Sequence, residues 1–178
     1  MLDNLKTELD KFRKAVIQQS RSNLTRTRKN ASKRLYDSLK SNLKISPNSF
    51  QLDFTMEQYG EFQDRGVKGV KSGSSLSNYS YKSKGGKHGL KGMPPPKAFD
   101  KWIVRRGLAP RNKSGQFLSR KTLQFLIARK VFLHGIKPSM FFTKPFENEY
   151  KKLSDNIIKA YGLDMTNFLS YTLTNYKK

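Results

Sequence analysis

The chain has 178 residues, and its 36 lysines and arginines against 13 aspartates and glutamates give a formal net charge of +23. It contains no cysteine, which excludes disulfide frameworks, thiolate metal sites and thiol nucleophiles. No apolar run approaches the roughly 18 residues that a membrane-spanning helix needs, so no membrane partner is expected.

The first predicted element is a helix over residues 2–17. Its apolar residues recur at spacings of three and four, the period of one helix face. They are Leu2, Leu5, Leu9, Phe12 and Val16. The polar and basic stretch that follows, residues 20–32, lacks an apolar period, which predicts a loop or an exposed extension of the helix.

A β-hairpin is predicted next. Residues 35–45 read as a short turn or helix that runs into a strand, and Pro47-Asn48 is typical of a turn. The second strand is indicated by strict alternation of apolar and polar residues, with one apolar face. That face consists of Phe50, Leu52, Phe54 and Met56.

The middle of the chain combines short helices with a long basic insertion. A helix over residues 57–65 is predicted to end at Gly66, with a positive φ at this glycine. Residues 66–96 are rich in Gly, Ser and Lys and too long for an ordinary connection, so they are expected to be a functional or a disordered loop.

Two further helices are predicted over residues 97–107 and 119–135. The first would turn Phe99, Trp102 and Ile103 to one face, which places Trp102 in the core. Ser119 is the expected cap of the second, which has a broad apolar stripe and stops at Gly135. The stripe comprises Leu123, Leu126, Ile127, Val131 and Phe132.

The last predicted helix covers residues 146–161, with Pro145 in its first turn and Gly162 at its end. Its inward-facing residues are expected to be Phe146, Tyr150, Leu153 and Ile157. Four residues of the two last helices are predicted to pack on the apolar face of the hairpin: Leu126, Ile127, Leu153 and Ile157.

These elements predict an α+β fold. A small antiparallel sheet would be packed by the N-terminal helix, two central helices and the C-terminal helix, with the basic loop of residues 66–96 inserted. We expect one domain over residues 1–162, followed by a C-terminal arm over residues 163–178.

The charge is distributed by segment and indicates an anionic partner. Residues 65–121 hold 15 basic residues and one acid, Asp100, and a second basic stretch spans residues 21–34. Such segments predict contact with nucleic-acid phosphate, without base readout, or with an acidic protein surface. The candidate contact residues are Arg21, Arg26, Arg28, Lys29, Lys82, Lys84, Lys87, Lys91, Arg111 and Lys113.

Catalytic and cofactor motifs are missing from the sequence. The GxxxxGK[ST] and GxSxG patterns do not occur, and the run Gly-Gly-Lys-His at residues 85–88 lacks the Ser or Thr that completes a phosphate loop. The two histidines, His88 and His134, are not spaced as a metal-binding pair. We therefore expect no cofactor and no metal.

One fragment of an enzyme motif is present. Glu149 and Lys151 form the E-x-K half of a common nuclease site, which also needs an upstream acid to share the metal. No acid lies between Asp100 and Glu147, so the match is interpreted as chance.

Several short motifs follow one another in a characteristic order. They are Arg-Leu-Tyr-Asp-Ser-Leu at 34–39, Phe-Thr-Met at 54–56, Tyr-Gly-Glu-Phe-Gln-Asp-Arg-Gly at 59–66, Leu-Ile-Ala-Arg-Lys at 126–130 and Phe-Phe-Thr-Lys-Pro-Phe at 141–146. This order resembles the tail-completion and head–tail joining (neck) proteins of tailed bacteriophages, over roughly residues 30–162.

The resemblance implies a non-enzymatic virion protein, assembled in the bacterial cytoplasm. Its subunits would form a ring of six or twelve between portal and tail, lining or surrounding the DNA channel, and would contact portal and tail proteins. The N-terminal helix and residues 163–178 are the expected inter-subunit arms. Two alternatives remain: a nonspecific basic nucleic-acid-binding protein, supported by charge, and an enzyme such as a nuclease, supported by the E-x-K pair.

Overall fold

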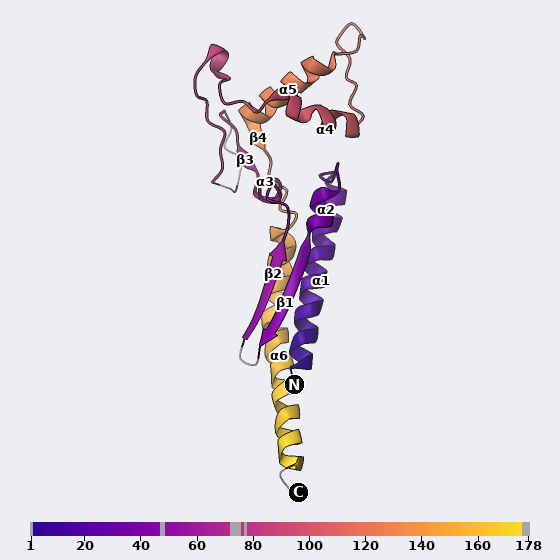
Figure 1. Ribbon diagram of the computed structural model, residues 1–178, viewed down its shortest axis with the longest axis vertical. Coiled ribbons are helices and arrows are strands. Elements are labelled where there is room, and N and C mark those ends of the chain that lie inside the picture. The colour runs from indigo at the N-terminus through magenta and orange to yellow at the C-terminus, as the bar shows by residue number, and fades with distance from the viewer. Residues whose placement is uncertain (1, 47–48, 72–75, 77, 176–178) are drawn as a thin grey trace. The chain divides into compact units, whose positions relative to one another are not determined.

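The computed structural model describes residues 2–46, 49–71, 76 and 78–175, and it is a mixed fold of helices and small antiparallel sheets (Figure 1). The chain forms two compact units, where the sequence analysis expected one domain over residues 1–162. Unit 1 comprises residues 1–26, 36–57 and 141–178, and unit 2 comprises residues 27–35 and 58–140. The predicted α+β class is confirmed, and Pro47-Asn48 lies outside the described residues.

Unit 1 consists of two long helices and a hairpin. Helices α1 (Asp3–Arg26) and α6 (Thr143–Asn175) pack side by side, and strands β1 (Lys40–Ser46) and β2 (Ser49–Thr55) lie along them (Figure 1). The strands pair antiparallel, with Lys40 opposite Thr55 and Leu43 opposite Leu52. The predicted first helix and hairpin are therefore confirmed, and the short helix α2 (Arg34–Ser38) precedes β1 as expected.

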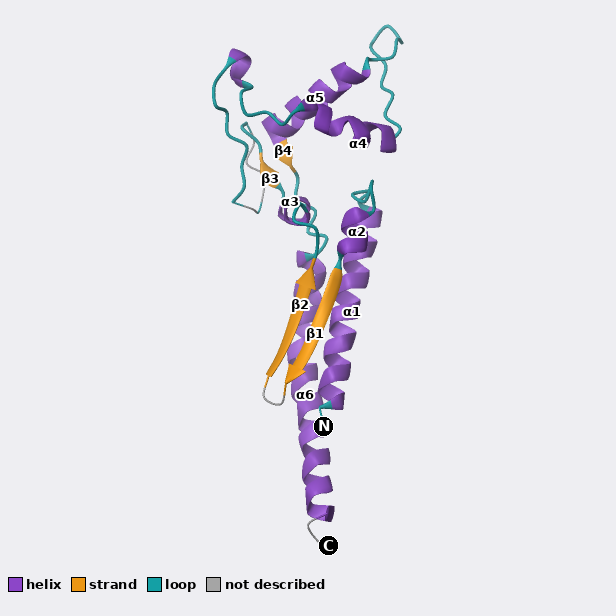
Figure 2. Cartoon of the chain, in the orientation of Figure 1, coloured by secondary structure: helices purple, strands orange, loops and turns teal. Residues whose placement is uncertain are grey.

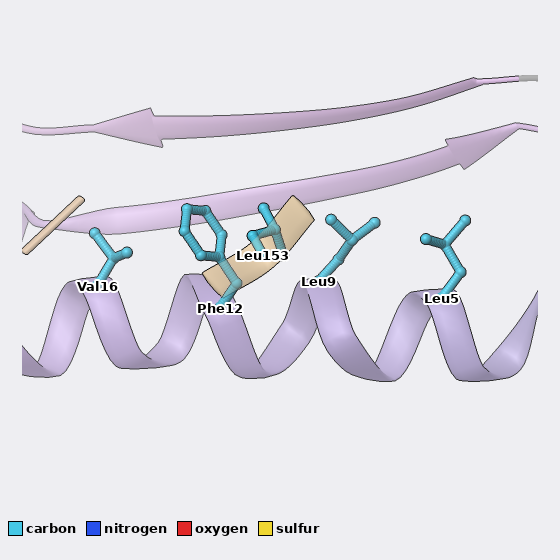
Figure 3. Close-up of a cluster of buried hydrophobic side chains, with 5 residues drawn as sticks. All are labelled: Leu5, Leu9, Phe12, Val16 and Leu153. Carbon is cyan, nitrogen blue, oxygen red and sulfur yellow. The ribbon is translucent and has the colours of Figure 1, made fainter. Parts of the chain in front are cut away.

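The core of unit 1 is the apolar stripe of α1. Leu5, Leu9, Phe12 and Val16 are buried together with Leu153 of α6, and Figure 3 shows the four α1 side chains on one face of the helix. Leu43, Leu52 and Phe54 of the hairpin pack against this cluster, as do Phe146 and Ile157 of α6. Phe12 meets Phe54 and Phe146 edge to face, with ring centroids 6.2 and 5.7 Å apart.

Parts of the predicted packing are wrong. Phe50 of β2 and Tyr150 of α6 are exposed. Phe50 lies opposite Ile45 at the turn end of the hairpin, and the Tyr150 ring stacks on Phe146 at a centroid distance of 5.8 Å. Leu126 is also exposed, and it belongs with Ile127 to unit 2. Leu52, Phe54, Leu153 and Ile157 do belong to one hydrophobic cluster, as predicted.

The predicted end of the last helix at Gly162 is wrong, and residues 163–175 are helical rather than a strand or separate arm. α6 begins at Thr143, with Pro145 in its first turn as expected, and continues through Gly162 to Asn175. A glycine inside a helix costs only about 1 kcal/mol relative to alanine. The buried side of α6 continues past it, through Leu153, Ala160 and Asp164, and holds the helix together.

Asp164 joins the C-terminal part of α6 to the start of α1. Its side chain is only 4% exposed. Oδ2 accepts a hydrogen bond from the backbone N–H of Leu5 at 3.0 Å, and Oδ1 accepts from the backbone and side chain of Asn4 at 3.2 and 3.0 Å. Burial raises the pKa of Asp164, but the hydrogen bonds from Leu5 and Asn4 outweigh it and hold the pKa below its usual 3.8.

We expect the Asp164→Ala variant to be less stable than the parent by about 1–2 kcal/mol at pH 7, the usual effect of losing an N-terminal helix cap. Because the folded-state pKa is lowered, this stabilisation is present above about pH 4 and is lost as the pH falls through the folded pKa. Urea unfolding at pH 7 and at about pH 2.5 measures both effects. A stability difference that persists undiminished at low pH would contradict the ionic cap.

Unit 2 contains the predicted central helices and a short strand pair (Figure 2). The helices are α3 (Gly60–Arg65), α4 (Asp100–Arg105) and α5 (Arg120–His134), with 3-10 turns η1 (Lys87–Gly89) and η2 (Pro96–Phe99) in the long connection. β3 (Val67–Lys68) pairs antiparallel with β4 (Gly135–Ile136). The expected loop of residues 66–96 thus carries the strand β3 and the 3-10 turn η1 among its described residues, and η2 begins at its last residue.

The helix boundaries of unit 2 follow the predicted signals. Ser119 caps α5, since its side-chain oxygen accepts a hydrogen bond from the backbone N–H of Thr122 at 3.1 Å. Gly66 ends α3 with φ +80°, and Gly135 ends α5 with φ +74°. These three predictions are confirmed.

Trp102 is not a core residue, so that prediction is wrong. Ile103 takes the buried position on α4, whereas Trp102 is 39% exposed and the guanidinium of Arg106 lies 5.7 Å from its ring centroid. The two neighbours differ by about 100° around the helix, and the packed side of α4 is centred on Ile103 and leaves Trp102 at its margin.

Candidate interaction surfaces

The C-terminal half of α6 carries a large exposed apolar stripe. From residue 158 onward its members recur at helical spacing and turn to one side. The stripe consists of Ile158, Tyr161, Met165, Phe168, Leu169 and Leu173, all exposed. We call these six residues the α6 stripe. Scattered apolar side chains are common on protein surfaces, but a contiguous stripe marks an interaction site.

From Tyr161 onward the α6 stripe lies in a segment without basic residues. Between Lys159 and Asn175 the one charged residue is Asp164, which is buried against the start of α1. In a chain of net charge +23 this segment is unusual, because two copies can approach each other here without repulsion between cations.

A basic groove runs along another part of unit 1. It has a volume of about 710 Å³ and lies between α1, Tyr36 and the start of β1. Its lining combines basic and neutral residues: Arg13, Lys14, Ile17, Gln18, Arg21, Ser22, Thr25, Arg26, Tyr36 and Ser41. We call it the α1 groove. Its described lining holds four cations and no carboxylate.

Two arginines of the α1 groove are fixed by the fold. Arg21 donates to the backbone oxygens of Tyr36 and Leu39 at 3.1 and 3.0 Å, and its guanidinium carbon lies 5.0 Å from the Tyr36 ring centroid. Arg13 pairs with Asp10 and reaches Ser41 at 3.4 Å. The hydrogen bond and charge of Arg13 lower the pKa of Asp10, although partial burial opposes this. The candidate contact Arg21 is therefore also a structural residue.

The remaining candidate contacts of the stretch 21–34 differ in their surroundings. Arg26 is exposed at the end of α1 and lines both the groove and a neighbouring hollow with Lys144. Arg28 and Lys29 belong to unit 2. Arg28 is exposed with φ +53°, whereas Lys29 Nζ donates to the backbone oxygen of Lys137 at 3.1 Å. Burial lowers the pKa of Lys29, against the opposing effect of Asp64.

The basic Gly-rich loop forms a compact turn in unit 2. Its backbone is closed by hydrogen bonds from Lys84 N to Lys91 O at 2.8 Å and from Lys91 N to Gly85 O at 2.9 Å. The side chains of Lys82, Lys84 and Lys91 are exposed around it. The side chain of Lys87 lies outside what the structure describes, although its backbone opens η1.

Arg111 and Lys113 lie at an exposed tip between α4 and α5. A backbone bridge joins Arg111 to Phe117, and the Arg111 guanidinium stacks 4.1 Å from the Phe117 ring centroid. Both Lys113 and Phe117 are exposed, Phe117 by 63%. Eight of the ten candidate contacts thus divide between the α1 groove, the basic loop and this tip, and Arg28 and Lys29 follow the end of α1 in unit 2. The α6 stripe was not predicted, because the last helix was expected to end at Gly162.

Among the described residues, no three or more His, Asp or Glu side chains lie together so that they could hold a metal ion. Glu149 accepts hydrogen bonds from Gln19 at 2.9 Å and Lys152 at 3.2 Å, and these contacts lower its pKa against the effect of partial burial. Its carboxylate therefore links α6 to α1. Lys151 is exposed.

No helix in the described part of the chain is long and apolar enough to cross a membrane. No protein-family model, curated protein or solved structure matches the chain.

Proposed function

We propose that the protein is a non-enzymatic structural subunit of a tailed-phage virion, which forms a ring at the neck between portal and tail. The order of motifs from residue 34 to residue 146 supports this proposal, since it resembles tail-completion proteins. The virion, assembled in the bacterial cytoplasm, would be its location, and copies of itself together with portal and tail proteins would be its partners.

The α6 stripe carries the proposal. A subunit of a stable assembly needs an apolar surface that is covered only when its neighbours are present. The α6 stripe supplies this surface on a helix that Asp164 joins to the start of α1. Its lack of basic residues allows contact between copies despite the high net charge.

In purified particles from the source, we expect this protein at the copy number of a ring. Quantitative mass spectrometry of nuclease-treated particles, scaled to the major capsid protein, measures it. A copy number near six or twelve, the usual order of such closed rings, is the expected result. Absence from the particles would contradict the neck assignment, and hundreds of copies would indicate a capsid or packaged protein.

The second candidate is a nonspecific nucleic-acid-binding protein acting outside the virion. The α1 groove favours it, because four cations line one hollow. Binding of DNA alone does not separate the two functions, since a protein with this net charge attracts DNA at low salt in either case. Presence in the particle at ring stoichiometry does separate them.

A further inference from the structure

We propose that the α1 groove is a binding site for the phosphodiester backbone of a nucleic-acid strand, without readout of the bases. The site is defined by its own geometry within unit 1, and the proposal holds whether or not the protein forms a neck ring.

The cations of the groove are arranged for a linear anion. Arg13, Lys14, Arg21 and Arg26 follow the axis of α1, and at about 1.5 Å per residue they span about 20 Å. A row of cations of this length extends over more than one phosphate of a nucleic-acid strand, whereas a single small anion would occupy a fraction of it.

Two of the cations are held in place before a ligand arrives. Arg21 is fixed on Tyr36 and Leu39 by hydrogen bonds, and Arg13 is fixed on Asp10. Each guanidinium has five N–H donors, so these contacts leave others for a phosphate oxygen. Lys14 and Arg26 are exposed and supply two further charges, and Arg26 donates a hydrogen bond to Asn23 Oδ1 at 3.1 Å. Prior fixation of two cations reduces the entropy lost on binding.

The neutral residues of the groove favour phosphate over an acidic peptide. Gln18, Ser22, Thr25, Tyr36 and Ser41 accompany the cations, and side chains of these types bind phosphate oxygens and sugars in protein–DNA complexes. Guanidinium groups match the oxygens of phosphates and of carboxylates in pairs, so the preference for phosphate rests on these neutral side chains.

The test measures binding of a short fluorescein-labelled oligothymidine by fluorescence anisotropy over a range of salt concentrations. The full chain is compared with the double variant Lys14→Gln/Arg26→Gln, which removes the two exposed cations and leaves the fixed arginines intact. The control is Lys151→Gln/Lys159→Gln, which removes the same charge from exposed positions of α6 in the same unit.

We expect the groove variant to bind at least about tenfold more weakly near 0.1 M salt, with the slope of log K against log salt reduced by about one per cation removed. The control is expected to change both quantities far less. Circular dichroism verifies that both variants are folded. Equal losses in the two variants would overturn the proposal, because the binding would then follow net charge and not the groove.

Competition decides between the two classes of anion. We expect unlabelled oligothymidine to displace the probe from the parent protein at a concentration at which polyglutamate of equal total charge does not. Displacement by polyglutamate at the same charge concentration would identify the groove as a site for acidic protein segments and would overturn the assignment to nucleic acid.

Discussion

Replacing Gly135 with alanine is expected to destabilise unit 2 by about 3 kcal/mol or more, with loss of the β3–β4 pair. Gly135 has φ +74° and ψ −165°, a region that glycine alone adopts readily. A Cβ at this position would also overlap the carbonyl oxygen of Val67 and lie 2.6 Å from the backbone nitrogen of Gly69. The backbone of residues 67–69 would have to move away from the end of α5.

The consequences extend beyond one residue. Residues 67–71 are hydrogen-bonded to the end of α5. Val70 N donates to Phe132 O at 3.0 Å, and Lys71 N donates to Leu133 O at 2.9 Å. On its other side Lys68 exchanges hydrogen bonds with Tyr79 and Tyr81. Displacing this segment would therefore also release the start of the basic loop.

Two further glycines separate the dihedral effect from the steric effect. Gly107 has φ +61°, and a Cβ added there would meet no atom within 4 Å, so Gly107→Ala reports on the backbone conformation alone, at about 1 kcal/mol. Gly162 lies in α6 with equally open space around it, so Gly162→Ala is expected to stabilise the protein by about 1 kcal/mol. Urea unfolding measures the free energy of unfolding of the three variants, which is expected to be lowest for Gly135→Ala and highest for Gly162→Ala. A Gly135→Ala protein as stable as Gly107→Ala would contradict the expected steric effect.

Placing charges on the α6 stripe is expected to abolish self-association. In the double variant Met165→Glu/Leu169→Glu, two apolar side chains that would be buried between copies become carboxylates. Burial of each such side chain contributes about 1.5–3 kcal/mol, so the association constant is expected to fall at least about a hundredfold. Sedimentation velocity at several protein concentrations measures the assembly state of the parent and the variant.

The matched control places the same two charges on another side of α6. Leu163 and Ser170 are exposed, seven residues apart, and roughly opposite the α6 stripe at about 100° per residue. Leu163→Glu/Ser170→Glu is expected to assemble like the parent. A parent protein that stays monomeric at all concentrations, or a control that dissociates equally, would contradict the role of the stripe.

The sequence predicted the elements whose signals are local. The spacing of Leu5, Leu9, Phe12 and Val16 indicated α1, the alternation after Phe50 indicated β2, and Ser119 indicated the start of α5. These features depend on residues within a few positions of each other. Burial of one face determines α1 and β2, and one capping hydrogen bond determines the start of α5, so the local pattern was sufficient to predict them.

The features that failed depend on distant partners. Gly162 was read as a helix end, but contacts of Leu153, Ala160 and Asp164 on the same side of α6 carry the helix through it. Residues 153, 157, 160 and 164 continue the spacing of one helix face and so indicate that the helix extends past Gly162. The spacing was not recognised because Asp164 is charged and was not expected on a buried face. Similarly, the choice between Trp102 and Ile103 as the buried residue depends on packing in unit 2, which the helical period does not determine.

The α1 groove was half predicted. Arg21 and Arg26 were expected to contact an anion because of the local excess of basic residues, and the structure brings them together with Arg13 and Lys14 in one hollow. The sequence could not group them with Tyr36 and Ser41, since those residues reach the groove only through the packing of β1 on α1.

The pairing of α1 with α6 also sets the order of events while the chain is synthesised. α1 is translated first, but Leu153 and the carboxylate that holds Asn4 and Leu5 come about 150 residues later. All of unit 2 leaves the ribosome in between. A nascent chain that stops short of α6 therefore presents the apolar stripe of α1 without its partner helix, so incomplete chains are open to chaperones and proteases in a way that the finished protein is not.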